Sequence, residues 1–265
     1  MPLMVCQASN LKQSQMVFLP KIWMPSQDIP SLCDSTRETC LVPFLNVLTK
    51  LNDSTSSGLV QPITCIISDG CMSFSVKAAE ELGIPIVLFW PTSPCGFLGI
   101  AHFQSVIDKG LVPLKDETDL TNGYLNTKVD WIPGMRSIQL RDLPSFIRTT
   151  DPNDLLLNFL IAEVENANKA TAIILNTFEE LDQDVVNVLA LMFPPVYTIG
   201  PLHMLADQVS QRNLVSIGSN MWKEDTECLQ WLESKKPRSV VYVNYGSSHS
   251  HDSRSTHGVC LGIGQ

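Results

Sequence analysis

Short apolar runs alternate along the chain with longer segments in which apolar residues recur at helical spacing. Runs rich in β-branched and aromatic residues predict strands at 63–68, 86–90, 171–176, 196–199 and 239–245. The segments with helical spacing predict helices at 35–51, 72–82, 93–109, 151–164, 177–191 and 224–234. Strands that alternate with helices predict an α/β fold, in which helices cover both faces of a parallel sheet.

Four residues have the local pattern of a helix start. Ser35 and Thr177 each precede a glutamate by three residues, which is the spacing of a capping box. Ser93 and Asp151 each directly precede a proline, which is favoured in the first turn. We therefore expect helices to begin at these four positions.

Parallel α/β sheets bind their ligands beyond the carboxyl ends of the strands. Three turn positions directly follow predicted strands, namely Asp69, Pro91 with Thr92, and Gly246 with Ser247. The stretch 111–150 is rich in proline, glycine and aspartate, and predicts a long functional loop region.

Charge and cysteine content narrow the partners and the compartment. The formal net charge is −9 and the pI about 5.0, which disfavours nucleic acid or an anionic membrane as a partner. The eight cysteines are scattered without a CxxC pair, as in reduced cytosolic proteins. No signal peptide or membrane-spanning run is visible. We expect a cytoplasmic protein without nucleic-acid partner or membrane insertion.

Asp69 allows two interpretations. An aspartate before glycine is common turn chemistry, and it can also be a carboxylate that orients a catalytic histidine. The second interpretation needs a histidine, yet the first in the chain is His102, inside a predicted helix. That position is more typical of a pocket or core histidine than of a base.

Other candidate chemistry is weaker. The run "HSHDSRSTH" holds three histidines that are conceivable zinc ligands, but its polar composition favours a solvated tail, so we predict no metal site. The "NYGSS" turn can cradle a phosphate or simply end a strand. Neither GxGxxG, a Walker A lysine nor GxSxG occurs, so a nicotinamide cofactor, P-loop chemistry and the usual α/β-hydrolase signature gain no support.

Seven segments in a fixed order carry a family resemblance that covers about residues 27–247. They are "QDIPSLCDSTRETC", "CIISDGCMSFSVKAAEELGIPIVLFW", "WIPGM", "LRDLPSF", "AIILNTFEELD", "VYTIGPL" and "ECLQWLESKKPRSVVYVNYGS". Together they resemble the plant UDP-glycosyltransferases, most of all the glucosyltransferases of terpenoid and cyanohydrin aglycones, including the 7-deoxyloganetin type.

The resemblance implies a GT-B fold, in which two Rossmann-like domains face a cleft and hold the acceptor and the UDP-sugar. It implies an inverting transfer, in which a histidine deprotonates the acceptor hydroxyl and an aspartate, here Asp69, partners that histidine. It further implies substrate-binding roles for Cys71, Pro91, Thr92 and Ser247. The UDP-sugar, assumed to carry glucose, is then a co-substrate, and no separate cofactor is expected.

The chain departs from the family pattern at three places. It has no histidine upstream of Asp69, it has Pro91 where a threonine is usual, and the donor-binding signature that should follow Ser247 is missing. We therefore expect truncation at both ends. The expected organisation is a divergent segment (1–26), a partial acceptor domain (27–200), a linker with a helix (201–238), the first donor strand (239–247) and a divergent tail (248–265).

These departures predict a chain that does not transfer sugar, although its family does. Losing a general base alone costs about 10² to 10⁴ in rate. Two alternatives stay open at this point. The chain is either a fragment that binds a small molecule without catalysis, or a non-functional truncated gene product with an exposed strand edge.

Overall fold

The structure is a computed structural model that describes residues 29–58, 61–208, 230–231 and 233–236. The chain divides into two compact units, of which the first comprises residues 1–19 and 30–211 and the second residues 20–29 and 212–265. The sheet and the candidate site belong to the first unit.

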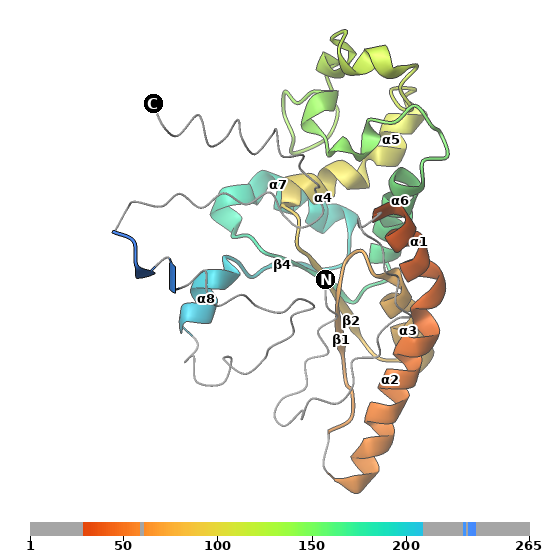
Figure 1. Cartoon of the computed structure of the whole chain (residues 1–265), viewed down its shortest axis with the longest axis vertical. Coiled ribbons are helices and arrows are strands. Elements are labelled where there is room, and N and C mark those ends of the chain that lie inside the picture. The colour runs from red at the N-terminus through yellow and green to blue at the C-terminus, as the bar shows by residue number, and fades with distance from the viewer. Residues whose placement is uncertain (1–28, 59–60, 209–229, 232, 237–265) are drawn as a thin grey trace. The chain divides into compact units, whose positions relative to one another are not determined.

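Four parallel strands form the sheet in the described part of the chain. They lie in the order β1 (Ile66–Asp69), β2 (Ile86–Trp90), β3 (Ala172–Leu175) and β4 (Val196–Thr198), which is also their order in the sequence (Figure 1). Asp69 pairs with Phe89, and Trp90 pairs with Leu175, so the carboxyl ends of β1, β2 and β3 meet at one edge. The predicted α/β fold with a parallel sheet is confirmed.

Eight α-helices connect and cover these strands in the described part of the chain. Their bounds are α1 (Ile29–Thr39), α2 (Leu41–Asp53), α3 (Ser73–Leu82), α4 (Pro94–Ala101), α5 (Phe103–Asp108), α6 (Leu155–Ala167), α7 (Glu179–Met192) and α8 (Leu202–Gln208). Helix α3 packs between α2 and α6, and α4 packs against both α6 and α7. Helix α6 is therefore in contact with helices from both earlier βα units.

One predicted helix start is confirmed and one is wrong. The Ser93 side chain accepts a hydrogen bond from the Gly96 backbone N–H at 3.1 Å, which caps α4. Ser35 instead lies inside α1, where its carbonyl accepts the Thr39 hydroxyl at 2.7 Å. The capping-box spacing at Ser35 failed because α1 already begins at Ile29.

The other two predicted starts are displaced by a few residues. Asp154, not Asp151, caps α6 by accepting the Leu157 backbone N–H at 2.9 Å. Thr177 donates its hydroxyl to the Asp182 carboxylate at 2.5 Å and does not act as the N-cap of α7. In both cases a side chain near the helix start forms a local hydrogen bond that decides where the helix begins, and residue spacing alone does not predict which side chain this is.

The predicted helix over 93–109 is two helices. His102 has φ −102° and ψ 6°, which breaks the helical path between α4 and α5. Gly110 then adopts the left-handed conformation (φ 68°) that ends α5. The predicted loop region 111–150 is confirmed, since its regular elements are 3₁₀ turns at Glu117–Leu120, Tyr124–Asn126, Leu140–Asp142 and Ser145–Ile147.

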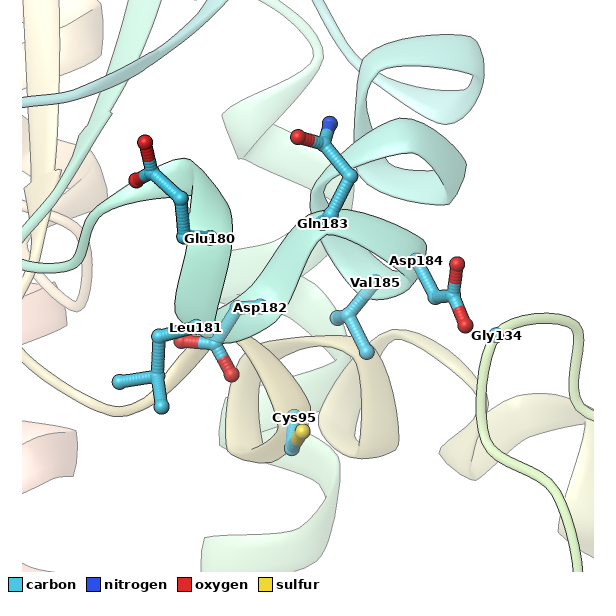
Figure 2. A pocket seen from close by; sticks show the side chains of 8 residues that line it. All are labelled: Cys95, Gly134, Glu180, Leu181, Asp182, Gln183, Asp184 and Val185. Atoms are coloured by element: carbon cyan, nitrogen blue, oxygen red, sulfur yellow. The ribbon is translucent and has the colours of Figure 1, made fainter.

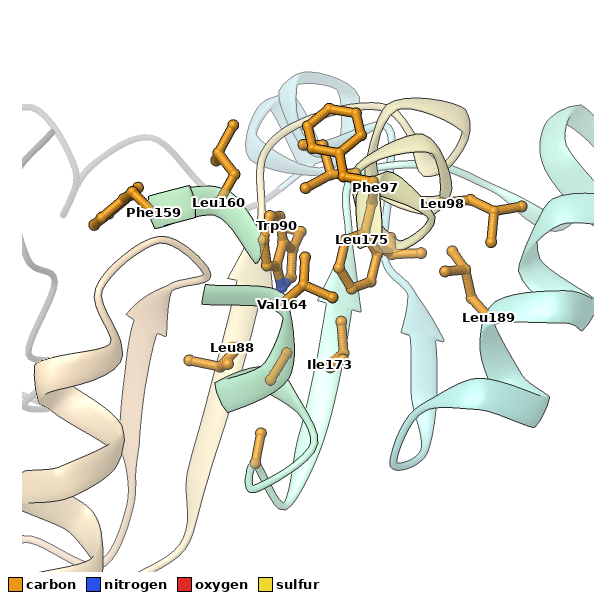
Figure 3. Packing of buried hydrophobic residues seen from close by; sticks show 14 of the residues in the cluster. Leu88, Trp90, Phe97, Leu98, Phe159, Leu160, Val164, Ile173, Leu175 and Leu189 are labelled. Atoms are coloured by element: carbon orange, nitrogen blue, oxygen red, sulfur yellow. The ribbon is translucent and has the colours of Figure 1, made fainter. Parts of the chain in front are cut away.

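Buried side chains of the sheet, of the helices α2 to α7 and of the 111–150 loop region form the core. Figure 3 shows the part around Trp90, where side chains of α4, α6 and α7 pack on β2 and β3. Trp90 is 0% exposed and stacks on Phe97 with 4.2 Å between ring centroids. Phe97 in turn lies 4.9 Å from Phe193. Burying a large apolar side chain stabilises the fold by roughly 1.5–3 kcal/mol. The carboxyl end of β2 is therefore anchored in the core.

Several predictions lie outside the described residues. They are the strand at 239–245, Ser247, the divergent segments 1–26 and 248–265, and most of the helix at 224–234. Within the predicted linker the structure has helix α8, which the sequence did not indicate. The boundaries between acceptor domain, linker and donor strand stay predictions.

Candidate functional site

Asp69 is the last residue of β1, and its carboxylate is held by the turn that follows. Its Oδ1 accepts the Cys71 backbone N–H at 2.8 Å, and its carbonyl accepts the Met72 N–H at 3.2 Å. The side chain is half-buried. This geometry is compatible with both interpretations of Asp69. Oδ1 stabilises the turn, and Oδ2 has no hydrogen-bond partner among the described residues, so it is available to orient a histidine.

Gly70 allows this turn to sit directly on Trp90. A Cβ atom at Gly70 would lie 2.4 Å from Cε2 of the Trp90 indole, which is far inside van der Waals contact. Any other residue would push the turn away from the core. The turn after β1 therefore packs directly against Trp90, the last residue of β2.

Cys71 follows in the same turn and is half-buried. Burial raises the pKa of the Cys71 thiol strongly, and the nearby carboxylates of Asp69 and Glu163 raise this pKa further. A thiol in such surroundings stays protonated and is a poor nucleophile. Cys71 therefore lies next to Asp69 as a half-buried, protonated thiol, and its substrate-binding role stays a prediction.

Pro91 and Thr92 follow β2 at the same edge of the sheet as Asp69, and both are exposed. Ser93 and Pro94 then begin α4. Of the predicted site residues, Asp69, Cys71, Pro91 and Thr92 thus share the carboxyl edge of β1 and β2. Ser247 lies outside the described residues.

The two described histidines lie at the junction of α4 and α5 and on α8. His102 Nδ1 lies 2.9 Å from the Leu98 carbonyl, and its ring lies 6.1 Å from that of Trp131. His203 is exposed on α8. The half-buried position of His102 fits the predicted pocket or core histidine.

Glu163 was missed by the sequence reasoning, and it lies next to this turn. It is 1% exposed, and its two carboxylate oxygens accept hydrogen bonds from the backbone N–H and the hydroxyl of Ser73 at 2.8 and 2.7 Å. Its position three residues after Leu160 and four after Phe159 puts it on the apolar face of α6. The sequence signal that could have identified Glu163 was a carboxylate among the apolar residues of one helix face, because buried carboxylates are rare unless they are paired.

A separate hollow lies where the first turns of α7 approach α4, as Figure 2 shows. Its volume is about 350 Å³, and it is lined by Cys95, Gly134 and Glu180, Leu181, Asp182, Gln183, Asp184 and Val185. Burial and the Asp182 carboxylate raise the pKa of Cys95. Three carboxylates in one small hollow disfavour an anionic ligand such as a diphosphate.

Neither a metal centre nor a membrane span occurs in the described part of the chain. No group of three or more histidine, cysteine, aspartate or glutamate side chains there is arranged to hold a metal ion. No helix among the described residues is long and apolar enough to cross a membrane.

Curated relatives match most of this chain. It is 58% identical over 222 residues to 7-deoxyloganetin glucosyltransferase of Gardenia jasminoides. It is 53% identical over 224 residues to (R)-mandelonitrile beta-glucosyltransferase of Prunus dulcis, and 54% identical over 224 residues to UDP-glycosyltransferase 85A2 of Arabidopsis thaliana. Each match covers 84% of the chain. By its sequence, this chain belongs to the plant UDP-glycosyltransferases. It spans about half the length of these relatives, 46% in each case.

Solved structures of plant glycosyltransferases share the fold. A UDP-glucosyltransferase from Polygonum tinctorium matches with a TM-score of 0.61 and 20% identity over 92% of this chain and 49% of its own. Os79 from O. sativa, in complex with UDP, matches with a TM-score of 0.60 and 20% identity, over 89% of this chain and 50% of its own. The described sheet is thus the Rossmann-like sheet of a GT-B fold. No model of a protein family matches the chain.

Proposed function

We propose that this chain is the acceptor-side half of a UDP-glucosyltransferase, which transfers glucose to a hydroxyl of a small plant metabolite. The observation that carries the proposal is the position of Asp69 at the carboxyl edge of the sheet, in a chain 58% identical to a 7-deoxyloganetin glucosyltransferase. Ligands of parallel α/β sheets bind at this edge.

In the proposed reaction a histidine removes the proton of the acceptor hydroxyl, and the oxygen attacks the anomeric carbon of the sugar with UDP as leaving group. The role of Asp69 is to fix the histidine tautomer and stabilise the imidazolium. The Cys71 N–H holds one oxygen of Asp69 at 2.8 Å, which supports an orienting role because it limits rotation of the carboxylate.

For the 265 residues taken alone, we propose binding of the acceptor without transfer of sugar. No histidine precedes Asp69 in these residues, and the first is His102, at the junction of α4 and α5. Without a base and a held donor, the reacting atoms are not brought into line for attack. UDP-glucose is the co-substrate, and the acceptors to try are those in the names of the relatives, 7-deoxyloganetin and mandelonitrile.

The test is calorimetry of the purified chain with 7-deoxyloganetin and with mandelonitrile, followed by an assay for glucoside with UDP-glucose present. We expect measurable heat of binding for at least one aglycone and no glucoside above the blank. No heat with either aglycone would refute the acceptor site. Glucoside formed above the blank would refute the proposed lack of transfer and leave the acceptor site standing.

A further inference from the structure

We propose that Glu163 is a positioning residue for Asp69, because its carboxylate on α6 fixes the first turn of α3 and thereby the turn that carries Asp69. What Asp69 does in catalysis rests on the proposed function. That Glu163 holds the turn rests on the contacts of this chain alone.

Glu163 is placed where a carboxylate needs a specific reason. It is 1% exposed on the apolar face of α6, and a buried carboxylate is costly unless it is well hydrogen-bonded. Both of its oxygens are satisfied by one residue, since Oε2 accepts the Ser73 N–H and Oε1 accepts the Ser73 hydroxyl. The partners lie 90 positions apart in the sequence, so the pair joins two separate βα units.

Helix α3 depends on this contact for its N-terminal cap. Its own N-cap residue is Met72, whose side chain makes no capping hydrogen bond. The first N–H groups of a helix have no partner within the helix, and a negative charge there is favoured by the helix dipole. Glu163 supplies from another helix the acceptor and the charge that Met72 lacks.

The capped end is continuous with the Asp69 turn. Residues 69–72 form one short turn, in which Asp69 accepts the Cys71 and Met72 N–H groups. Ser73 follows directly, so Glu163 holds one end of this turn while β1 holds the other. The Trp90 indole blocks displacement of Gly70 toward the core. Glu163 thereby limits the remaining freedom of the Asp69 carboxylate.

Hydrogen–deuterium exchange of individual backbone amides, monitored by NMR on the full 265-residue chain at neutral pH, tests this inference without any substrate. In Glu163→Ala we expect the Ser73 and Cys71 amides to exchange about tenfold to a hundredfold faster than in the parent chain, as for loss of a charged hydrogen bond. The Ile173 amide, bonded to the Pro195 carbonyl in the sheet, should be unchanged.

Three further variants separate positioning from general stability. Glu163→Gln can still accept the Ser73 N–H and donate to the Ser73 oxygen, and without the charge it should restore most of the parent protection at Cys71. Glu165→Ala changes an exposed residue of the same helix and should leave all three amides as they are. Ser73→Ala removes only the hydroxyl bond, should accelerate Cys71 by a few-fold, and decides the matter if Glu163→Ala does not fold.

The inference is overturned if Ser73 exchanges faster while Cys71 does not, because the turn then holds without Glu163. It is also overturned if Ile173 accelerates as much as Cys71, since Glu163 then merely stabilises the whole fold. Failure of the proposed function would be seen separately, as a chain that binds no aglycone but keeps the amide pattern described.

Discussion

At the scale of single residues, the turn after β1 shows how a carboxylate is fixed at the edge of a sheet. Asp69 accepts two N–H groups of its own turn, Gly70 rests on Trp90, and Glu163 holds the residue after the turn. Sequence pattern was enough to place Asp69, because a buried run followed by Asp-Gly is a local signal. It was not enough for Glu163, whose partner lies 90 positions away.

A methyl group at Gly70 should destabilise the chain. Gly70→Ala puts a carbon 2.4 Å from the Trp90 ring, and overpacking of this kind costs about 1–3 kcal/mol. Urea unfolding of the parent and the variant measures the difference. Gly96→Ala is the comparison variant, because its new Cβ meets the Ser93 hydroxyl oxygen at 3.3 Å, which is a tight contact but a much milder one than at Gly70. Alanine also favours the helix, so we expect a clearly smaller loss of stability than in Gly70→Ala. Equal stability of Gly70→Ala and the parent chain would contradict the described contact.

Glu163 should give the stability of the chain a pH dependence of a definite sign. Burial raises the pKa of Glu163 above its ordinary 4.5, although the Ser73 hydrogen bonds and the charges of Arg37 and Lys77 oppose this shift. The negative carboxylate also faces the thiols of Cys33 and Cys71, whose pKa values it raises.

An acid with a raised folded-state pKa binds its proton more tightly in the folded chain than in the unfolded one. Its contribution is fully present below the unfolded value and is lost as the pH rises through the folded pKa. Relative to Glu163→Gln, the parent chain should therefore gain stability as the pH is lowered from 8 toward about 4.5. Unfolding free energies of both proteins across this range give the answer, and a difference that is flat or grows with pH would contradict the raised pKa.

At the scale of elements, periodicity located the strands and helices well, and cap motifs located their ends poorly. The apolar spacing predicted α2, α3, α6 and α7 and the four described strands, because buried faces impose a period on the sequence. The predicted start at Ser35 was wrong because α1 already begins at Ile29, and the one at Asp151 was displaced because Asp154 nearby offers the same side-chain oxygen. The packing of the helix then decides which of these side-chain oxygens caps its N-terminus, and sequence spacing does not contain that information.

The cap of α6 offers a direct comparison of the two candidate aspartates. Asp154→Ala should lower the free energy of unfolding by about 0.5–2 kcal/mol, because it leaves the Leu157 N–H without its acceptor. Asp151→Ala removes only the bond to the Asn153 N–H in an exposed turn and should cost clearly less. Thermal or urea unfolding ranks the two, and a larger loss at Asp151 would restore the sequence-based start.

At the scale of the whole molecule, the described residues form one half of a GT-B fold, with the candidate site at the carboxyl ends of its strands. The chain spans 46% of its 7-deoxyloganetin glucosyltransferase relative, and β1 has a strand neighbour on one side only in the described sheet. Sequence motifs identified the family because seven segments agree in order. They left the shape of the proposed acceptor pocket open, since that shape depends on contacts between distant loops.

The most direct test of the central claim is an NMR titration of the isotope-labelled chain with 7-deoxyloganetin and mandelonitrile. An acceptor site at the carboxyl edge predicts amide shifts centred on Asp69, Cys71 and Thr92. Amides at the opposite, amino-terminal ends of the strands, such as those of Ile86 in β2 and Ala172 in β3, should not shift. Shifts confined to those opposite ends, or no shifts with either aglycone, would contradict the account.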